Sequence, residues 1–282
     1  MKKRDSVRGF GIGLRPCHYS DFLTSQPEVD FVEIISENYM VSGGNSVETL
    51  KEISTRNPVI PHGISLSVGS SDAIDWEYLG RLKKLVDQLD PPWFSDHLCW
   101  SRHKGHYMHN LLPLPYTSDI ARFVAEKTKI IQDYMERPML LENVSSYIEY
   151  TESTMTEWEF ISEVVNQADC GLLLDINNIY VSAINHNFDP MDYIREVPAE
   201  RVRQHHIAGH KNNGSFLLDT HDHNVPDPVW DLYRQSIPLF GSVPLILERD
   251  DDIPTLTELL DELAIARHIF YDVTAPITSS TT

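Results

Sequence analysis

The chain has 282 residues, enough for a large core in one or two domains, and carries 42 acidic against 23 basic residues, a formal net charge of −19. Such a negative charge repels nucleic-acid phosphates and anionic lipids, so we expect neither a nucleic acid nor a membrane as partner. Three widely spaced cysteines without a CxxC pair argue against a disulfide framework, and no apolar segment follows the basic N-terminus. We therefore expect a soluble, cytoplasmic protein.

Short apolar segments alternate with longer amphipathic ones from end to end, without a linker-like break in composition. The expected strands are 10–15, 30–36, 58–63, 93–98, 138–144, 171–177, 203–209 and 244–250. Helical patterns lie between them, for example at 72–89, 118–135, 154–168 and 227–240, and Thr154 and Glu157 have capping-box spacing. Eight β-then-α units predict an α/β fold, a single (β/α)8 TIM-barrel domain over residues 1–282, with a doubly wound open sheet as the alternative.

Ionisable side chains stand at six of the expected strand ends, where a (β/α)8 barrel builds its active site. They are His62, His97, Glu142, Asp175, His206 and Glu248. One such residue alone is more often structural, but carboxylates that converge on one mouth repel each other unless cations or shared protons compensate. The set therefore predicts a metal cluster, and its mixture of imidazole and carboxylate suits zinc, manganese or iron rather than a thiolate site.

The stretch LLDTHDHNVPDP, residues 217–228, adds further metal-binding side chains in the loop after the seventh expected strand. Asp219 and His221 are two residues apart, so in an extended segment their side chains point the same way. We expect these two as ligands, and Asp222 or His223 as surface groups or as hydrogen-bond partners of ligands. A polar, exposed loop without ligands is the alternative interpretation.

Seven motifs resemble the multinuclear non-heme iron dependent oxidase family, which includes the methanobactin biosynthesis oxidase. They are HGISLS, SDHLCW, LLPLPYT, LLENVSSY, LLLDINNIYVSA, HIAGH and DTHDHNVPDPVWDLY, and the resemblance extends from GIGLR to LILERDDDIP. It implies a barrel akin to xylose isomerases and endonuclease IV, two or three iron ions per chain, and a dioxygen-dependent rearrangement of cysteine. It also implies a Cys-containing, ribosomally made precursor peptide as substrate and a partner protein that delivers this peptide.

The order of ligands is also similar to that of the trinuclear zinc site of endonuclease IV, which implies three ion sites. The assignments are His62, His97 and Glu142 for one ion, Glu142, Asp175, His206 and Glu248 for a second, and Asn178, Asp219 and His221 for a third. Glu142 would bridge the first two ions, and Glu142, Asp175 and His206 are the candidate catalytic residues. Asn178 stands where the nuclease pattern has histidine, so the third ion should bind less tightly.

Two other enzyme classes are compatible with these ligands. A zinc- or manganese-dependent phosphodiesterase would use them to activate a hydroxide, and a sugar isomerase would use two ions. The acidic composition counts against a DNA substrate. A non-enzymatic metal scaffold fits poorly, because storage does not need ligands from six strands around one mouth.

Several further histidines and amides have less defined roles in this interpretation. The segment SRHKGHYMHN (101–110) carries His103, His106 and His109 at three-residue spacing, and we expect it in the loop after the fourth strand as a lid or peptide entry. Other polar residues close to the ligands in sequence are candidates for orienting them through hydrogen bonds: Asn143, Asn177, His186 and His210.

Overall fold

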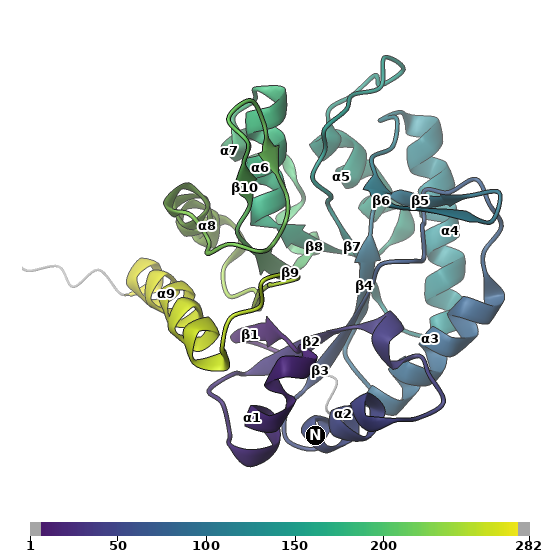
Figure 1. Cartoon of the computed structure of the whole chain (residues 1–282). Coiled ribbons are helices and arrows are strands. Elements are labelled where there is room, and N and C mark those ends of the chain that lie inside the picture. Colours follow the sequence, from purple (N-terminus) through teal and green to yellow (C-terminus); the bar gives the residue numbers. More distant parts are fainter. Residues whose placement is uncertain (1–6, 276–282) are drawn as a thin grey trace, which may run out of the picture.

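Eight parallel strands close into a barrel in the computed structural model, which describes residues 7–275 (Figure 1). They are β1 (Phe10–Gly13), β2 (Phe31–Ile35), β3 (Val59–Gly63), β4 (Phe94–His97), β7 (Met139–Glu142), β8 (Gly171–Asp175), β9 (Val202–Ile207) and β12 (Leu245–Leu247). Their order around the barrel is β1-β12-β9-β8-β7-β4-β3-β2. The prediction of a TIM barrel is confirmed, and the open-sheet alternative is excluded because β1 pairs with both β12 and β2.

Helices surround the barrel on its outer side (Figure 1). They are α1 (Tyr19–Thr24), α2 (Asn45–Ser54), α3 (Trp76–Leu89), α4 (Ser118–Met135), α5 (Glu157–Ala168), α6 (Ile176–His186), α7 (Pro190–Glu196), α8 (Asp227–Phe240) and α9 (Leu256–Thr274). Both α4 and α8 have the predicted bounds, whereas α3 begins four residues later than expected. None of the helices within residues 7–275 is long and apolar enough to cross a membrane.

The helix α5 begins three residues later than expected, and its N-cap moves by two residues. The capping box is formed by Thr156 and Glu159 instead of Thr154 and Glu157. The Thr156 hydroxyl accepts from the backbone N–H of Glu159, and the Glu159 carboxylate accepts from the backbone N–H of Thr156. The reason is tertiary contact: the backbone N–H of Thr154 donates to the carbonyl of Tyr116 at 2.9 Å, and the Tyr193 hydroxyl donates to the Glu157 carboxylate at 3.0 Å.

Alternation along the strands separates the barrel interior from the helix-facing side. Phe31, Ile60 and Ile246 pack with Val7 into a small apolar cluster of their own. Outward residues such as Leu141 and Leu172 join the larger core beneath the helices. The candidate ligands occupy inward positions toward the C-terminal ends of the strands, whereas Glu33 lies inside the barrel in the middle of β2.

The connection after β4 forms an antiparallel hairpin of β5 (Trp100–His103) and β6 (His106–Leu112). The Ser67 hydroxyl accepts from the backbone N–H of Ser101 at 2.8 Å, and the Arg102 guanidinium donates to Asp75 at 3.0 Å. These bonds fix β5 against the segment after β3, while most of β6 is exposed. Two shorter strands, β10 (Lys211–Asn212) and β11 (Leu217–Leu218), pair before the DTHDH segment.

Candidate metal centre

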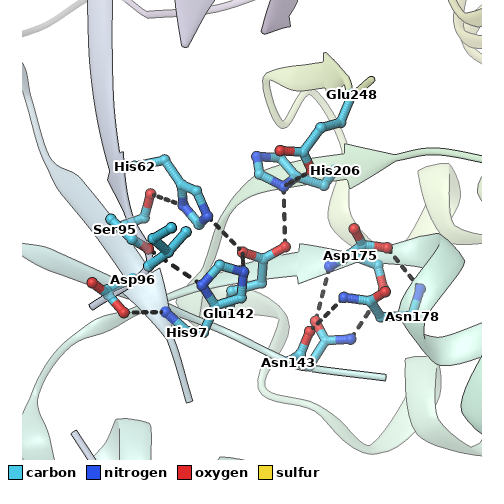
Figure 2. Close-up of polar contacts among 12 residues, drawn as sticks. His62, Ser95, Asp96, His97, Glu142, Asn143, Asp175, Asn178, His206 and Glu248 are labelled. Atoms are coloured by element: carbon cyan, nitrogen blue, oxygen red, sulfur yellow. Dashed lines mark hydrogen bonds and ion pairs between the residues drawn. The ribbon is translucent and has the colours of Figure 1, made fainter. Parts of the chain in front are cut away.

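The barrel fold brings together the six side chains at the predicted strand ends (Figure 2). His62, His97, Glu142, Asp175 and His206 lie in the last residues of their strands, and Glu248 directly follows β12. All six side chains are buried. Parallel strands end at the same rim of a barrel, which explains why residues from 62 to 248 meet at one place.

These side chains form two groups, and each group is compact enough to bind one ion. Ligand atoms lie within 4.8 Å of one another in the group of His62, His97 and Glu142, and in the group of Glu142, Asp175, His206 and Glu248. Glu142 belongs to both groups. Figure 2 shows its carboxylate between them: Oε2 is 3.3 Å from Nε2 of His62 and of His97, and Oε1 is 3.0 Å from Nδ1 of His206.

The third group differs in composition from the expected one. Atoms of His221, Glu248 and Asp250 lie within 4.8 Å of one another, and sequence reasoning did not single out Asp250. Asp219 contacts His221, with Oδ1 2.7 Å from Nε2, and Asn178 lines the same cavity as both. The residues expected for a third ion therefore meet at one place, with Asp250 as an additional carboxylate.

Unpaired polar atoms show that this site fits bound cations. Two buried atoms of the site, Asp175 Oδ2 and Asn178 Oδ1, have no hydrogen-bond partner within residues 7–275. Leaving such groups unpaired costs about 1–3 kcal/mol each, and more for charged ones. A cation that accepted their lone pairs would remove this cost, and imidazole, carboxylate and amide oxygen are suitable donors.

Hydrogen bonds from outside the groups orient the candidate ligands. The His62 Nδ1 atom lies 2.8 Å from the Ser95 hydroxyl, and the His97 Nδ1 atom lies 3.2 Å from the Gly63 carbonyl. Both rings thus present Nε2 to Glu142. Asp175 caps α6 by accepting from the backbone N–H of Asn178 at 2.7 Å, which leaves its second oxygen directed away from the helix end.

The expected orienting roles of two asparagines agree with their contacts. Asn143 brackets the backbone of Asp175: its oxygen accepts from the N–H at 2.8 Å, and its nitrogen donates to the carbonyl at 3.0 Å (Figure 2). Asn177 donates to Asp219 at 2.8 Å, and its oxygen lies 2.7 Å from Nδ1 of His210. These bonds hold Asp175 and Asp219 in fixed positions.

Other histidines singled out in the sequence lie outside the three groups. His103 and His106 face each other across the exposed end of the β5–β6 hairpin, and His109 lies farther along β6. His186 bonds Ser146, and His223 bonds its neighbour Asp222 at the surface. The regular spacing of histidines in the sequence therefore does not by itself predict that they bind a metal ion.

Burial and neighbouring charges shift the pKa values of the ligands in the metal-free protein. Burial raises the pKa of Glu142 and of Asp175 to about 7. Burial also lowers the pKa of His62 well below its usual value, with a further contribution from the neighbouring His97 ring. Burial lowers the pKa of His206 too, but nearby carboxylates, chiefly that of Glu33, outweigh it and raise this pKa well above its usual value.

A cavity of about 190 Å³ opens onto the candidate ligands. Its polar lining residues include His62, His97, His221, Glu248 and Asp250. Its apolar lining residues are Ile35, Ile64, Leu111 and Val144. Leu111 comes from β6, so the hairpin after β4 contributes to the wall of the cavity.

Comparison with solved structures shows that the chain shares the TIM-barrel fold with proteins that include a xylose isomerase-like one. D-psicose 3-epimerase in the presence of D-fructose has a TM-score of 0.62 at 11% identity, over 94% of this chain and 99% of that one. A xylose isomerase-like TIM barrel protein from Mycobacterium smegmatis in complex with magnesium has a TM-score of 0.60 at 10% identity, over 98% and 100%. The IOLI protein with a binding zinc atom has a TM-score of 0.58 at 13% identity, over 95% and 98%.

Sequence comparison identifies the family. Residues 9–271 match the model of the RiPP precursor modification enzyme family MbnB/TglH/ChrH, and the chain belongs to this family. RiPP denotes a ribosomally synthesised and post-translationally modified peptide. A UPF0276 protein of Caulobacter vibrioides is 52% identical over 260 residues, 92% of this chain and 93% of that protein, and one of Rhizorhabdus wittichii matches to the same extent. The family indicated by the sequence motifs is thereby confirmed.

Proposed function

We propose that this protein is an iron-dependent oxidase that modifies cysteine residues of a ribosomally made precursor peptide with dioxygen. The observation that carries the proposal is the position of Glu142 between two buried groups of imidazoles and carboxylates, in a member of a peptide-modifying enzyme family. We further propose two or three ions per chain, with His62, His97, Glu142, Asp175, His206 and Glu248 as ligands of two of them. The third would involve Asn178, Asp219 and His221, with Asp250 added.

Iron, when bound, would supply the one-electron chemistry with dioxygen that protein side chains lack. The residues of this chain would supply the rest. His62, His97 and His206 would contribute neutral donors, while Glu142, Asp175 and Glu248 would balance the positive charge. We propose Glu142, Asp175 and His206, which all belong to the second group, as the catalytic residues.

The cavity indicates what kind of substrate group the site would accept. Its described lining contains no lysine or arginine, and it includes four aliphatic side chains. A small, uncharged side chain such as that of cysteine suits this surface, whereas a phosphodiester would meet no lysine or arginine there. The aliphatic side chains, including those of Leu111 and Ile64, would also keep water from the reacting thiol.

The proposal includes the surroundings of the reaction. A Cys-containing precursor peptide would be the substrate, and a partner protein would bring it to the barrel mouth. We propose the cytoplasm as the compartment, since the peptide is made there and its thiols stay reduced. Zinc or manganese, with phosphodiester hydrolysis or sugar isomerisation, is the alternative that an experiment must distinguish.

One preparation loaded with iron and another loaded with zinc provide the test. Each is given a Cys-containing precursor peptide together with a candidate partner protein, a Cys→Ser version of that peptide, and separately a DNA duplex with an abasic site. The proposal predicts oxygen uptake and a mass change only with iron, air and the cysteine peptide. Zinc-dependent nicking of the duplex, without oxygen uptake by the iron form, would favour the phosphodiesterase instead.

A further inference from the structure

Glu33 is a buried carboxylate inside the barrel that belongs to none of the three candidate ligand groups. It lies in the middle of β2 between Val32 and Ile34, and its residue is 3% exposed. Its Oε1 atom is 2.7 Å from Nε2 of His206. An ionised carboxylate is costly to bury, so its partners indicate what it does there.

Two further side chains fix the orientation of this carboxylate. The indole Nε1 of Trp93 donates to Oε1 of Gln204 at 2.8 Å. Because an indole nitrogen can only donate, it identifies the amide oxygen of Gln204 and turns the amide nitrogen toward the barrel interior. That nitrogen donates to the second oxygen of Glu33. Both carboxylate oxygens are therefore engaged, one by Gln204 and one by His206.

The contact with Glu33 determines which ring nitrogen of His206 faces the candidate metal centre. With Nε2 engaged, Nδ1 is the atom directed at Glu142 and Glu248, at 3.0 and 3.1 Å. His62 and His97 have the opposite arrangement: their Nδ1 atoms contact the neutral Ser95 hydroxyl and Gly63 carbonyl. On the nitrogen turned away from the centre, His62 and His97 each have a neutral partner, whereas His206 has the carboxylate of Glu33.

We propose that Glu33 is a positioning residue of the metal centre, which holds the His206 ring so that Nδ1 binds the ion and which strengthens that atom as a donor. A carboxylate that accepts the second N–H of a ligand histidine fixes its tautomer and raises its basicity. Gln204 and Trp93 act one step farther away by holding Glu33. The inference rests on the proposed metal centre but not on iron or on the peptide chemistry.

The test measures binding of Co²⁺ alone to the metal-free full chain, by chelator competition and by the visible absorption of the bound ion. The variants are Glu33→Ala, Glu33→Gln and Trp93→Phe. Glu262→Gln is the matched control, because this buried carboxylate pairs with Arg249 at 2.6 Å and contacts none of the candidate ligand side chains. Circular dichroism and thermal unfolding verify that each variant is folded.

Glu33→Ala should weaken Co²⁺ binding at the His206 group by about 10–100-fold and shift the absorption of that ion, as loss of such partners does elsewhere. Glu33→Gln should recover part of the affinity, since one amide oxygen replaces only one of two carboxylate oxygens. Trp93→Phe should show a smaller loss, and Glu262→Gln none. If Glu33 had a purely structural role, the Glu33 and Trp93 variants would have lower unfolding temperatures but the Co²⁺ affinity of the parent protein.

Two negative outcomes have different meanings. Parental Co²⁺ affinity and absorption in folded Glu33→Gln and Trp93→Phe would overturn the role of Glu33, even if Glu33→Ala did not fold. A parent protein that binds less than about one Co²⁺ per chain would overturn the metal centre itself, and the role of Glu33 with it.

Discussion

At the scale of single residues, Glu142 has the largest predicted effect, because its carboxylate faces both buried groups. Glu142→Gln should lower metal content at both groups and reduce activity by at least roughly 100-fold, more than loss of a partner outside the ligand groups does. The metal-free fold should persist, since the amide has the same shape and removes a buried charge. Metal analysis, circular dichroism and peptide turnover measure these effects.

Asn178→Ala is the matched comparison for this substitution. Its amide oxygen is one of the buried atoms without a hydrogen-bond partner in the described chain, but it lies outside the two groups that share Glu142. We expect a lower occupancy of one ion only and a milder loss of activity. If both variants kept the metal content of the parent, the proposed ligand assignment would be wrong.

The buried ligands also predict how the stability of the metal-free protein depends on pH. Glu142 and Asp175 have folded-state pKa values of about 7, above their values of about 4.3 and 3.9 in unfolded chains. The pKa values of His206 and His221 are also raised in the folded state. In all four cases the folded state holds protons that the unfolded state has released, so stability falls as pH rises.

The free energy of unfolding of the metal-free protein should therefore decrease from about pH 6.5 to 8, with a slope of up to about 1.4 kcal/mol per pH unit for each such group. Added Zn²⁺ should reverse the trend, because its ligands must be deprotonated. Denaturant titrations at several pH values with and without the ion measure both slopes. A metal-free protein that gains stability over this range would contradict the prediction.

Part of the site was predictable from single residues, and part was not. The six strand-end residues were recognisable because the ends of short apolar segments fix where parallel strands meet. Glu33 carried a signal that went unused, an acidic residue inside the apolar segment DFVEIIS. Asp250 lies in the acidic run ERDDD, where sequence does not distinguish the carboxylate that turns toward His221 from its exposed neighbours.

At the scale of elements, the β5–β6 hairpin is the candidate contact surface for the peptide. It contributes Leu111 to the cavity wall and exposes Tyr107 and Met108, whose relative accessibilities are 44% and 47%. Replacing both exposed residues by serine should raise the KM for the precursor peptide by about tenfold, since aromatic and apolar anchors dominate such interfaces. Metal content should stay unchanged.

Tyr271→Ser is the control for this double variant, because Tyr271 is exposed and its helix α9 lies across the barrel from the hairpin (Figure 1). Steady-state kinetics at saturating oxygen separate KM from kcat. An unchanged KM in the double variant, or an equal rise in the control, would remove the hairpin from the peptide-binding surface.

The elements themselves show where sequence reasoning has limits. Apolar segments placed all eight barrel strands correctly because buried parallel strands need continuous apolar residues. The N-terminus of α5 was misplaced because Thr154 and Thr156 both have an acidic residue three positions later, and the choice depends on tertiary bonds to Tyr116 and Tyr193. The hairpin after β4 was expected only as a loop, since its polar residues lack the alternation of a half-buried strand.

At the scale of the whole molecule, the barrel concentrates buried carboxylates at one mouth, and the Arg15 guanidinium contacts only two of the candidate ligands, Glu248 and Asp250. Metal ions bound to the folded state should therefore raise the unfolding temperature, by an amount that depends on their concentration and affinity. The surface remains strongly acidic, with a formal charge of −19 for the chain, which agrees with a substrate other than nucleic acid.

The central claim is that this mouth holds a multinuclear metal centre, and metal quantification tests it most directly. Protein produced with ample iron and purified anaerobically without chelators should contain two or three transition-metal ions per chain, predominantly iron, by elemental analysis against protein concentration from amino-acid analysis. The Glu142→Gln protein, prepared in parallel, should contain fewer. Less than about one ion per chain in the parent protein would contradict the account.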